Sequence, residues 1–274
     1  MLAAYLSSAR PTILYRKQRI ASLVALPAVI ATLWACPQAA QAQEYWTGGA
    51  GTSDWHDAAN WSIGVPTAGY YTFMGFNSTS ATAVISADAY ASFLNLGSDA
   101  GVDLSVTGGA TLAVTYGLGV GDADGITADM TVTGATVNTP NTYVGVGGIG
   151  ILTLEEGASL TSDYVSVGNG TTADGTLTVT GSGSQLTSDS TLSVGAEGIG
   201  SVVLDDSANM TSWYTYIGET PTGMGSVTVS NGATWTNNGY LYVGSEGTGT
   251  LAISSGGAAG SYYGYLGYLA DSIG

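Results

Sequence analysis

The chain has 274 residues, a length that suits one large domain or two ordinary ones. All 42 glycines follow residue 43 and make up 42 of the 231 residues there, about 18%, against about 7% in an average protein. The same part holds all 20 carboxylates and no lysine or arginine, so it repels phosphate backbones and anionic lipid. This composition excludes long helices, nucleic-acid binding and polybasic docking on membranes, and it favours short strands with many turns.

Residues 1–42 have the pattern of a signal peptide. Basic residues at 10–19 precede an apolar run at 20–35, which is shorter than the roughly 18 residues of a spanning helix. The small-residue step at its end predicts cleavage between Ala42 and Gln43. A retained membrane anchor and lipidation at Cys36 remain open as alternatives. After cleavage at Ala42 the chain would contain no cysteine, so no disulfide could stabilise it.

Residues 43–95 begin with a tryptophan-rich segment that contains Trp46, Trp55 and Trp61, together with Asn60 and Pro66. The open end of a stack of strands exposes apolar side chains and unpaired backbone groups. We therefore expect this segment to cap the first turns of the repeats that follow.

Residues 96–274 carry a repeat of about 24 residues, each unit marked by an apolar residue followed by glycine. The steps are Leu96-Gly97, Val120-Gly121, Val144-Gly145, Val167-Gly168, Val194-Gly195, Ile217-Gly218, Val243-Gly244 and Leu266-Gly267. Within a unit, an alternating segment such as Leu152-Thr153-Leu154 and then a step such as Ala158-Ser159-Leu160 return. This alternation indicates three short strands per repeat.

A unit of this size cannot bury its apolar side chains alone and must stack on its neighbours. The sequence therefore predicts an all-β fold, a right-handed parallel β-helix whose turns follow one another at about 4.8 Å. The residue before each repeat glycine should point inward and lie in register with its counterparts. The alternative, a β-propeller, needs blades of about 40 to 50 residues.

The repeats resemble those of autotransporter (type V secretion) passengers, also called PEP-CTERM-associated repeats. The likeness rests on segments such as Gly175-Thr-Leu-Thr-Val-Thr-Gly-Ser-Gly-Ser184 and Tyr242-Val-Gly-Ser-Glu-Gly-Thr-Gly249, and on the leader Tyr45-Trp46-Thr-Gly-Gly49. It covers about residues 44–274. The resemblance implies a secreted or surface-exposed bacterial protein associated with the outer membrane, often an adhesin.

The sequence departs from this family at its end, because residues 272–274 lie within a repeat and no segment of amphipathic barrel strands follows. We therefore expect a truncated passenger, a monomer that would reach the outer membrane only through a translocator missing from this sequence. The expected partner is a host or cell-surface glycan or protein, with no nucleic acid and no cofactor.

Two outward rows of side chains are the candidate adhesive face. They occupy the positions two and four residues before the repeat glycines, where strand alternation directs side chains away from the core. Their tyrosines are Tyr143, Tyr164, Tyr214, Tyr216, Tyr240, Tyr242, Tyr263 and Tyr265. Tyrosine can pack on sugars or apolar surfaces while its hydroxyl forms hydrogen bonds. The alternative is that these rings only cover the strands or face a neighbouring loop.

The residue types present argue against most enzyme classes. The single histidine, His56, lies in the tryptophan-rich segment, and no G-x-S-x-G motif or zinc-binding cluster accompanies it. A polysaccharide lyase is also excluded, because such enzymes generally use a basic residue. We predict no catalytic, metal-binding or cofactor-binding residue.

Acidic and glycine-rich motifs leave one alternative function. Glu155-Glu156 and Asp205-Asp206 should lie on one edge, two turns or roughly 10 Å apart, so a hydrolase that uses paired carboxylates on carbohydrate remains an alternative. The segment Asp122-Ala123-Asp124-Gly125 lacks the remaining ligands of a calcium loop. Glycine-rich steps near residue 147 indicate turns, since no helix follows them as in a dinucleotide site.

Overall fold

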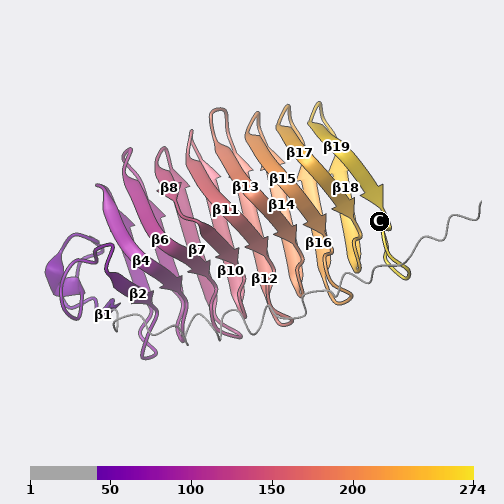
Figure 1. Ribbon diagram of the computed structural model, residues 1–274. Helices are drawn as coiled ribbons and strands as arrows, with labels where there is room; N and C mark the ends of the chain where they lie inside the picture. The colour runs from indigo at the N-terminus through magenta and orange to yellow at the C-terminus, as the bar shows by residue number, and fades with distance from the viewer. Residues whose placement is uncertain (1–41) are drawn as a thin grey trace, which may run out of the picture. The chain divides into compact units, whose positions relative to one another are not determined.

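The computed structural model describes residues 42–274, which form a parallel β-solenoid of about nine turns. Figure 1 shows the turns following one another in chain order. The predicted signal peptide, apart from Ala42, and Cys36 lie outside the described residues. Gln43, the predicted first residue after cleavage, belongs to the first strand, β1. No helix within residues 42–274 is long and apolar enough to cross a membrane.

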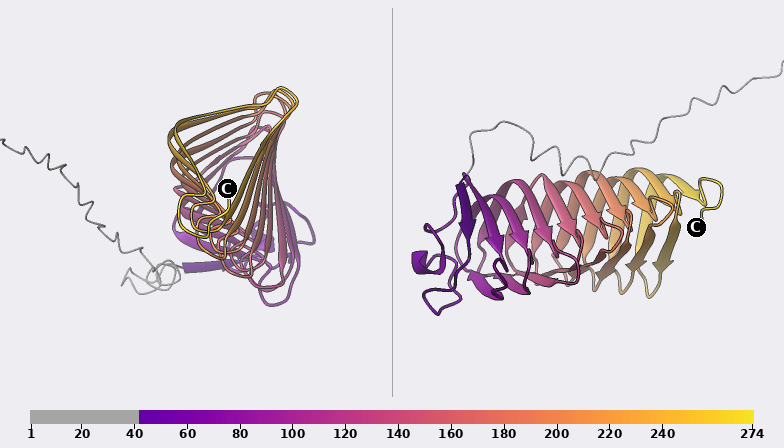
Figure 2. Two further views of the ribbon diagram at one scale, coloured as in Figure 1. Left: turned by 90° about the vertical axis from the view of Figure 1, so that its right-hand side faces the viewer. Right: turned by 90° about the horizontal axis from the view of Figure 1, so that it is seen from below.

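The solenoid has two sheets, which Figure 2 shows on opposite sides of the core. The eleven-stranded sheet consists of β1 (Ala42–Tyr45), β2 (Tyr70–Met74), β4 (Ala89–Leu96), β6 (Thr111–Val120), β8 (Thr136–Asn138), β9 (Asn141–Val144), β11 (Ser159–Val167), β13 (Gln185–Val194), β15 (Asn209–Ile217), β17 (Thr234–Val243) and β19 (Ala258–Leu266). The eight-stranded sheet consists of β3 (Ala81–Ile85), β5 (Val102–Val106), β7 (Thr127–Thr133), β10 (Ile149–Glu155), β12 (Asp174–Thr180), β14 (Ile199–Asp205), β16 (Met224–Val229) and β18 (Thr248–Ile253).

The apolar residue before each repeat glycine lies in register with its counterparts, as predicted. The pairs are Leu96 with Val120, Val120 with Val144, Val144 with Val167, Val167 with Val194, Val194 with Ile217, Ile217 with Val243 and Val243 with Leu266. All are buried except Leu266 in the last turn. The row extends to Met74, which pairs with Leu96 and precedes Gly75.

The glycine that follows this residue turns the chain between the sheets. Gly145, for example, has a φ of +70°, and a Cβ atom there would lie 2.7 Å from the backbone carbonyl carbon of Asp174 in the next turn. A left-handed backbone and close approach of a neighbouring turn both favour glycine.

The prediction of three strands per turn is correct only in the turn of β8 and β9, which Pro140 separates. In the other turns of the repeat the second and third strands join into one long strand with a register shift at its middle, as between Ser162 and Tyr164. The shift is a bulge, which bends a strand without ending it.

A buried polar row inside the core satisfies the backbone at these bulges. Its members in successive turns include Ser162, Ser188, Ser212 and Asn237. The Ser162 hydroxyl donates to the carbonyl of Tyr164 at 2.9 Å, and the Asn237 amide donates to the Ser212 hydroxyl at 3.1 Å. Buried polar groups need such partners, which explains why small hydroxyl and amide residues occupy this row.

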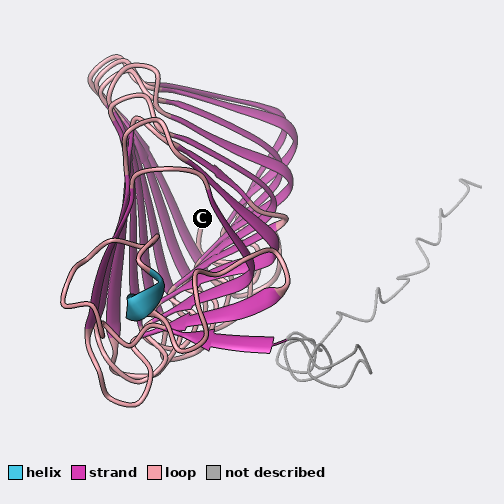
Figure 3. Cartoon of the chain, turned by 90° about the vertical axis from the view of Figure 1, so that its left-hand side faces the viewer, coloured by secondary structure: helices cyan, strands magenta, loops and turns pink. Residues whose placement is uncertain are grey.

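The tryptophan-rich segment packs on the first turns, as expected of a cap. Trp46, Trp55 and Trp61 are at most 5% exposed, and the ring of Trp61 lies 4.6 Å from that of Trp55. The backbone at Trp55 pairs with Val84 on edge strand β3, with an N–H to carbonyl distance of 3.1 Å. Figure 3 shows the short 3-10 helix η1 (Ala58–Asn60) in this segment.

Candidate functional site

The predicted tyrosines lie in two rows on the outer face of the eleven-stranded sheet. Register places Tyr216, Tyr242 and Tyr265 in one row. Tyr240 and Tyr263 are paired in the other row, where the ring of Tyr214 stacks on that of Tyr240. We call these six residues the tyrosine ladder. Their neighbours in the strand, such as Ile217 and Val243, are buried, so alternation gives the outward direction that the sequence predicts.

The rings of the ladder stack face to face across the turns. The centroid distance is 5.0 Å both from Tyr216 to Tyr242 and from Tyr242 to Tyr265, with interplanar angles of 2° and 11°. In the second row, the ring of Tyr240 lies 5.7 Å from that of Tyr214 and 4.9 Å from that of Tyr263. Both faces of Tyr240 and Tyr242 are thus covered by neighbouring rings, which leaves ring edges to meet a partner.

The stacking also affects the acidity of the phenols. Burial, followed by the neighbouring tyrosines, raises the pKa of Tyr242 to about 12. The pKa of Tyr216 is likewise raised, mainly by burial and secondly by Glu219. Tyr216 and Tyr242 therefore present neutral hydroxyl groups at physiological pH.

The other two predicted tyrosines form a separate pair. The ring centroids of Tyr143 and Tyr164 lie 5.9 Å apart, and burial raises the pKa of both hydroxyls. Ser166 and Ser193 occupy the row between this pair and the ladder.

Glu219 lies beside the serines that separate the Tyr143–Tyr164 pair from the ladder. It accepts a hydrogen bond from the Ser193 hydroxyl. Burial is the main cause of its raised pKa, and Glu246 and Glu197 contribute by repulsion. The eight predicted tyrosines are thus two groups on one sheet rather than an unbroken strip.

Aromatic residues at the start of the stack extend the same outward row and were missed by sequence reasoning. Tyr45 pairs with Phe73, and their ring centroids are 5.5 Å apart. The signal that could have found them is Met74-Gly75, a further repeat step whose methionine falls outside the Leu, Val and Ile pattern.

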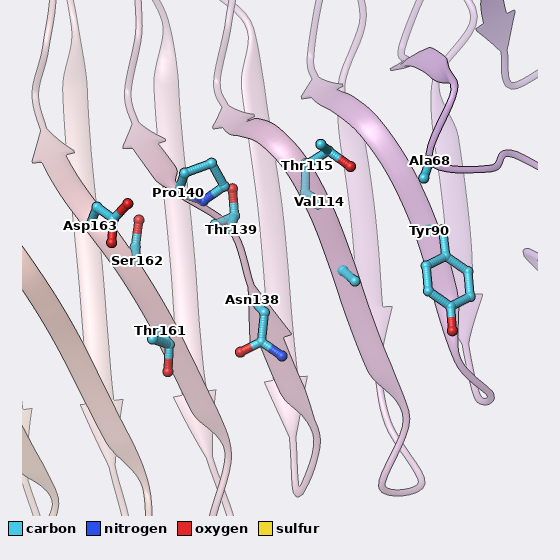
Figure 4. A pocket seen from close by; sticks show the side chains of 11 residues that line it. Ala68, Tyr90, Val114, Thr115, Asn138, Thr139, Pro140, Thr161, Ser162 and Asp163 are labelled. Carbon is cyan, nitrogen blue, oxygen red and sulfur yellow. The ribbon is translucent and has the colours of Figure 1, made fainter.

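A shallow groove of about 420 Å³ lies elsewhere on the eleven-stranded sheet and was also missed. It crosses β4, β6, β8 and β11, and Figure 4 shows its lining side chains. The lining consists of Ala68, Tyr90, Ala113, Val114, Thr115, Asn138, Thr139, Pro140, Thr161, Ser162 and Asp163. Counting back seven or eight residues from the repeat glycines reaches Tyr90, Ala113, Asn138 and Thr161, so their shared row could have been found from the sequence.

The paired carboxylates lie at turns of the eight-stranded sheet. Register pairs Leu154 with Val179 and Thr180 with Asp205, so Glu155 and Asp205 lie two turns apart, as predicted. The Asp205 carboxylate accepts hydrogen bonds from Ser230 at 2.7 Å and from Asn231 at 2.8 Å. These bonds lower its pKa, with Ser230 the largest cause, so Asp205 is ionised at neutral pH and suits a turn contact better than a proton donor.

The histidine and the remaining acidic residues form no cluster that resembles a metal centre. His56 contacts the backbone carbonyl of Asp88 through Nε2 at 3.1 Å. Within residues 42–274, no three His, Cys, Asp or Glu side chains lie close enough together to hold a metal ion.

Comparison of the chain with protein-family models, with curated proteins and with solved structures finds no match.

Proposed function

We propose that this chain is a secreted, non-enzymatic adhesive rod of the autotransporter-passenger type, displayed at a bacterial surface. The observation that carries the proposal is the tyrosine ladder, in which six rings from three successive turns form one stacked array. Its target is a host or cell-surface glycan or protein. The signal-peptide pattern of residues 1–42 and the repeat resemblance support export.

The ladder suits adhesion because its geometry is set before any partner binds. Stacked rings lose little side-chain freedom on association, since their neighbours already hold them. Tyrosine combines an apolar ring with a hydroxyl that both donates and accepts hydrogen bonds. Tyr214, in the first turn of the ladder, is 37% exposed, so a partner can reach the ladder from solvent.

Replacing Tyr214, Tyr216, Tyr240 and Tyr242 together by serine tests this role. We expect binding of the purified protein to bacterial or host cells to fall at least about tenfold. The loss of ring stacking should cost about 1 kcal/mol per residue in unfolding free energy, while the circular dichroism spectrum stays that of the parent.

The control is Tyr116→Ser, because Tyr116 is 41% exposed and lies outside the ladder. A folded quadruple variant that binds cells like the parent would refute the adhesive role. Release of reducing sugar from mixed polysaccharides, lost in Asp205→Asn, would instead favour the carbohydrate hydrolase that the sequence leaves open.

A further inference from the structure

We propose that the groove across β4, β6, β8 and β11 is a binding site for a neutral oligosaccharide, with Tyr90 as the ring on which a sugar packs. This site shares no residue with the tyrosine ladder. The inference goes beyond the adhesive role proposed above and can hold if that role fails.

The hollow exists because a small residue separates two larger ones in one outward row. Register places Tyr90 beside Ala113, Ala113 beside Asn138 and Asn138 beside Thr161. Tyr90 and Asn138 are thus two strands, or roughly 10 Å, apart. The methyl group of Ala113 leaves the space between them open.

Residues outside this row complete the lining of the groove. Pro140 separates β8 from β9, and Ala68 in the loop before β2 lies on the side of Tyr90. The floor is therefore largely apolar, formed by Ala113, Val114 and Pro140. An apolar floor suits the C–H face of a sugar ring better than it suits a charged ligand.

Tyr90 has a free ring, unlike the two middle tyrosines of the ladder. Its side chain is 50% exposed, and within residues 42–274 no other aromatic ring stacks on it. A sugar could pack on Tyr90 without displacing a protein ring. The two middle tyrosines of the ladder, with both faces covered, offer no such surface.

Polar side chains around the floor have hydrogen-bonding capacity to spare. Thr115, Asn138 and Asp163 are exposed, and their side chains make no hydrogen bond to another of the residues described. Asn138 can donate and accept, whereas the carboxylate of Asp163 only accepts. Sugar hydroxyls do both, so a sugar above Ala113 would meet Tyr90 on one side and Asn138 on the other.

The charge and length of the groove restrict the charge and size of the ligand that it can bind. No lysine or arginine occurs after residue 19, and Asp163 lines the groove, so uronates, sulfated sugars and phosphates would be repelled. From Tyr90 on β4 to Asp163 on β11 the groove spans three strand spacings, about 14 Å. This extent exceeds one sugar ring and fits a short linear chain laid across the strands.

The test is calorimetric titration of the purified full chain with cellotetraose, xylotetraose, mannotetraose, maltotetraose and chitotetraose, and with tetragalacturonate as the anionic comparison. We expect at least one neutral tetrasaccharide to bind with a millimolar or lower dissociation constant, and tetragalacturonate to bind at least about tenfold more weakly. Tyr90→Ala and Ala113→Phe should each weaken binding of that neutral sugar at least about tenfold. The first variant removes the platform and the second fills the hollow.

Tyr116→Ala is the control outside the groove and should bind like the parent, whereas Tyr90→Phe, which keeps the ring, should bind the sugar more tightly than Tyr90→Ala. Both positions of the test variants face outward, so circular dichroism should match the parent for all four proteins. The proposal is wrong if no neutral tetrasaccharide binds at millimolar concentration, if tetragalacturonate binds best, or if binding survives both test variants. The quadruple ladder variant should retain sugar binding, which separates this result from the outcome for adhesion.

Discussion

At the scale of single residues, the phenol of Tyr242 reports on the stacking of the ladder. Its pKa is raised to about 12, whereas a tyrosine in an unfolded chain titrates near pH 10. The neutral form is favoured in the folded state, so the stability that this group contributes is complete below about pH 10 and is lost as the pH rises toward 12.

This shift predicts a difference between the parent and Tyr242→Phe in a titration of phenolate absorbance. Subtracting the two curves under native conditions should give a midpoint near pH 12, and in concentrated urea a midpoint near 10. Equal midpoints in both solvents would mean that the ring of Tyr242 is not held in the stacked arrangement.

Gly145 is the second residue at which a single change has a predictable cost. In Gly145→Ala the new Cβ would press on the backbone of Asp174, with φ at +70°, and we expect a loss of at least about 3 kcal/mol in unfolding free energy. Gly125→Ala is the control, because Gly125 has a φ of +71° with open space around it. It should cost only the left-handed conformation, about 1 to 2 kcal/mol. Urea unfolding of both variants measures the difference, and equal losses would show that contact between turns is unimportant at this corner.

At the scale of strands, the repeat predicts the inward rows correctly because inward apolar side chains and a corner glycine are both visible in the sequence. The joining of two predicted strands into one is not visible there. Ser188 and Ser212 have the residue type of a turn, yet they are buried at a bulge, where Ser212 accepts hydrogen bonds from the side chains of Thr215, Trp235 and Asn237. Trp235 and Asn237 come from the next turn, more than 20 residues along the chain, and no local pattern reveals them.

The detailed geometry of the candidate sites likewise cannot be predicted from the sequence alone. Strand alternation predicts that Tyr240 and Tyr242 point outward, but ring orientation depends on the residues in adjacent turns, which here cover both faces of each ring. The groove depends on Ala113 lying between Tyr90 and Asn138. That placement requires the register, which one extra residue at a bulge can shift.

At the scale of the whole solenoid, stability should be a sum over turns and the contacts between neighbouring turns. Removing residues 174–198 deletes one complete turn, because Asp174 and Ile199 are register partners. We expect this variant to fold with an unchanged circular dichroism spectrum per residue and a single unfolding transition.

Removing residues 174–184 instead deletes β12 and the turn after it and leaves β10 and β14 without their shared partner. This variant should lose its cooperative transition in thermal unfolding followed by circular dichroism. If the two deletions behave alike, the turns are not independent structural units.

The stacking of turns sets the distance between the groove and the tyrosine ladder. The groove ends at β11 and the tyrosine ladder begins at β15, with β13 the strand between them in the same sheet. Each whole turn gained or lost there would change the span between the two surfaces by one step of about 4.8 Å and leave both surfaces intact. Duplication or loss of single repeats in the gene would therefore change this distance in fixed steps without altering the residues of either surface.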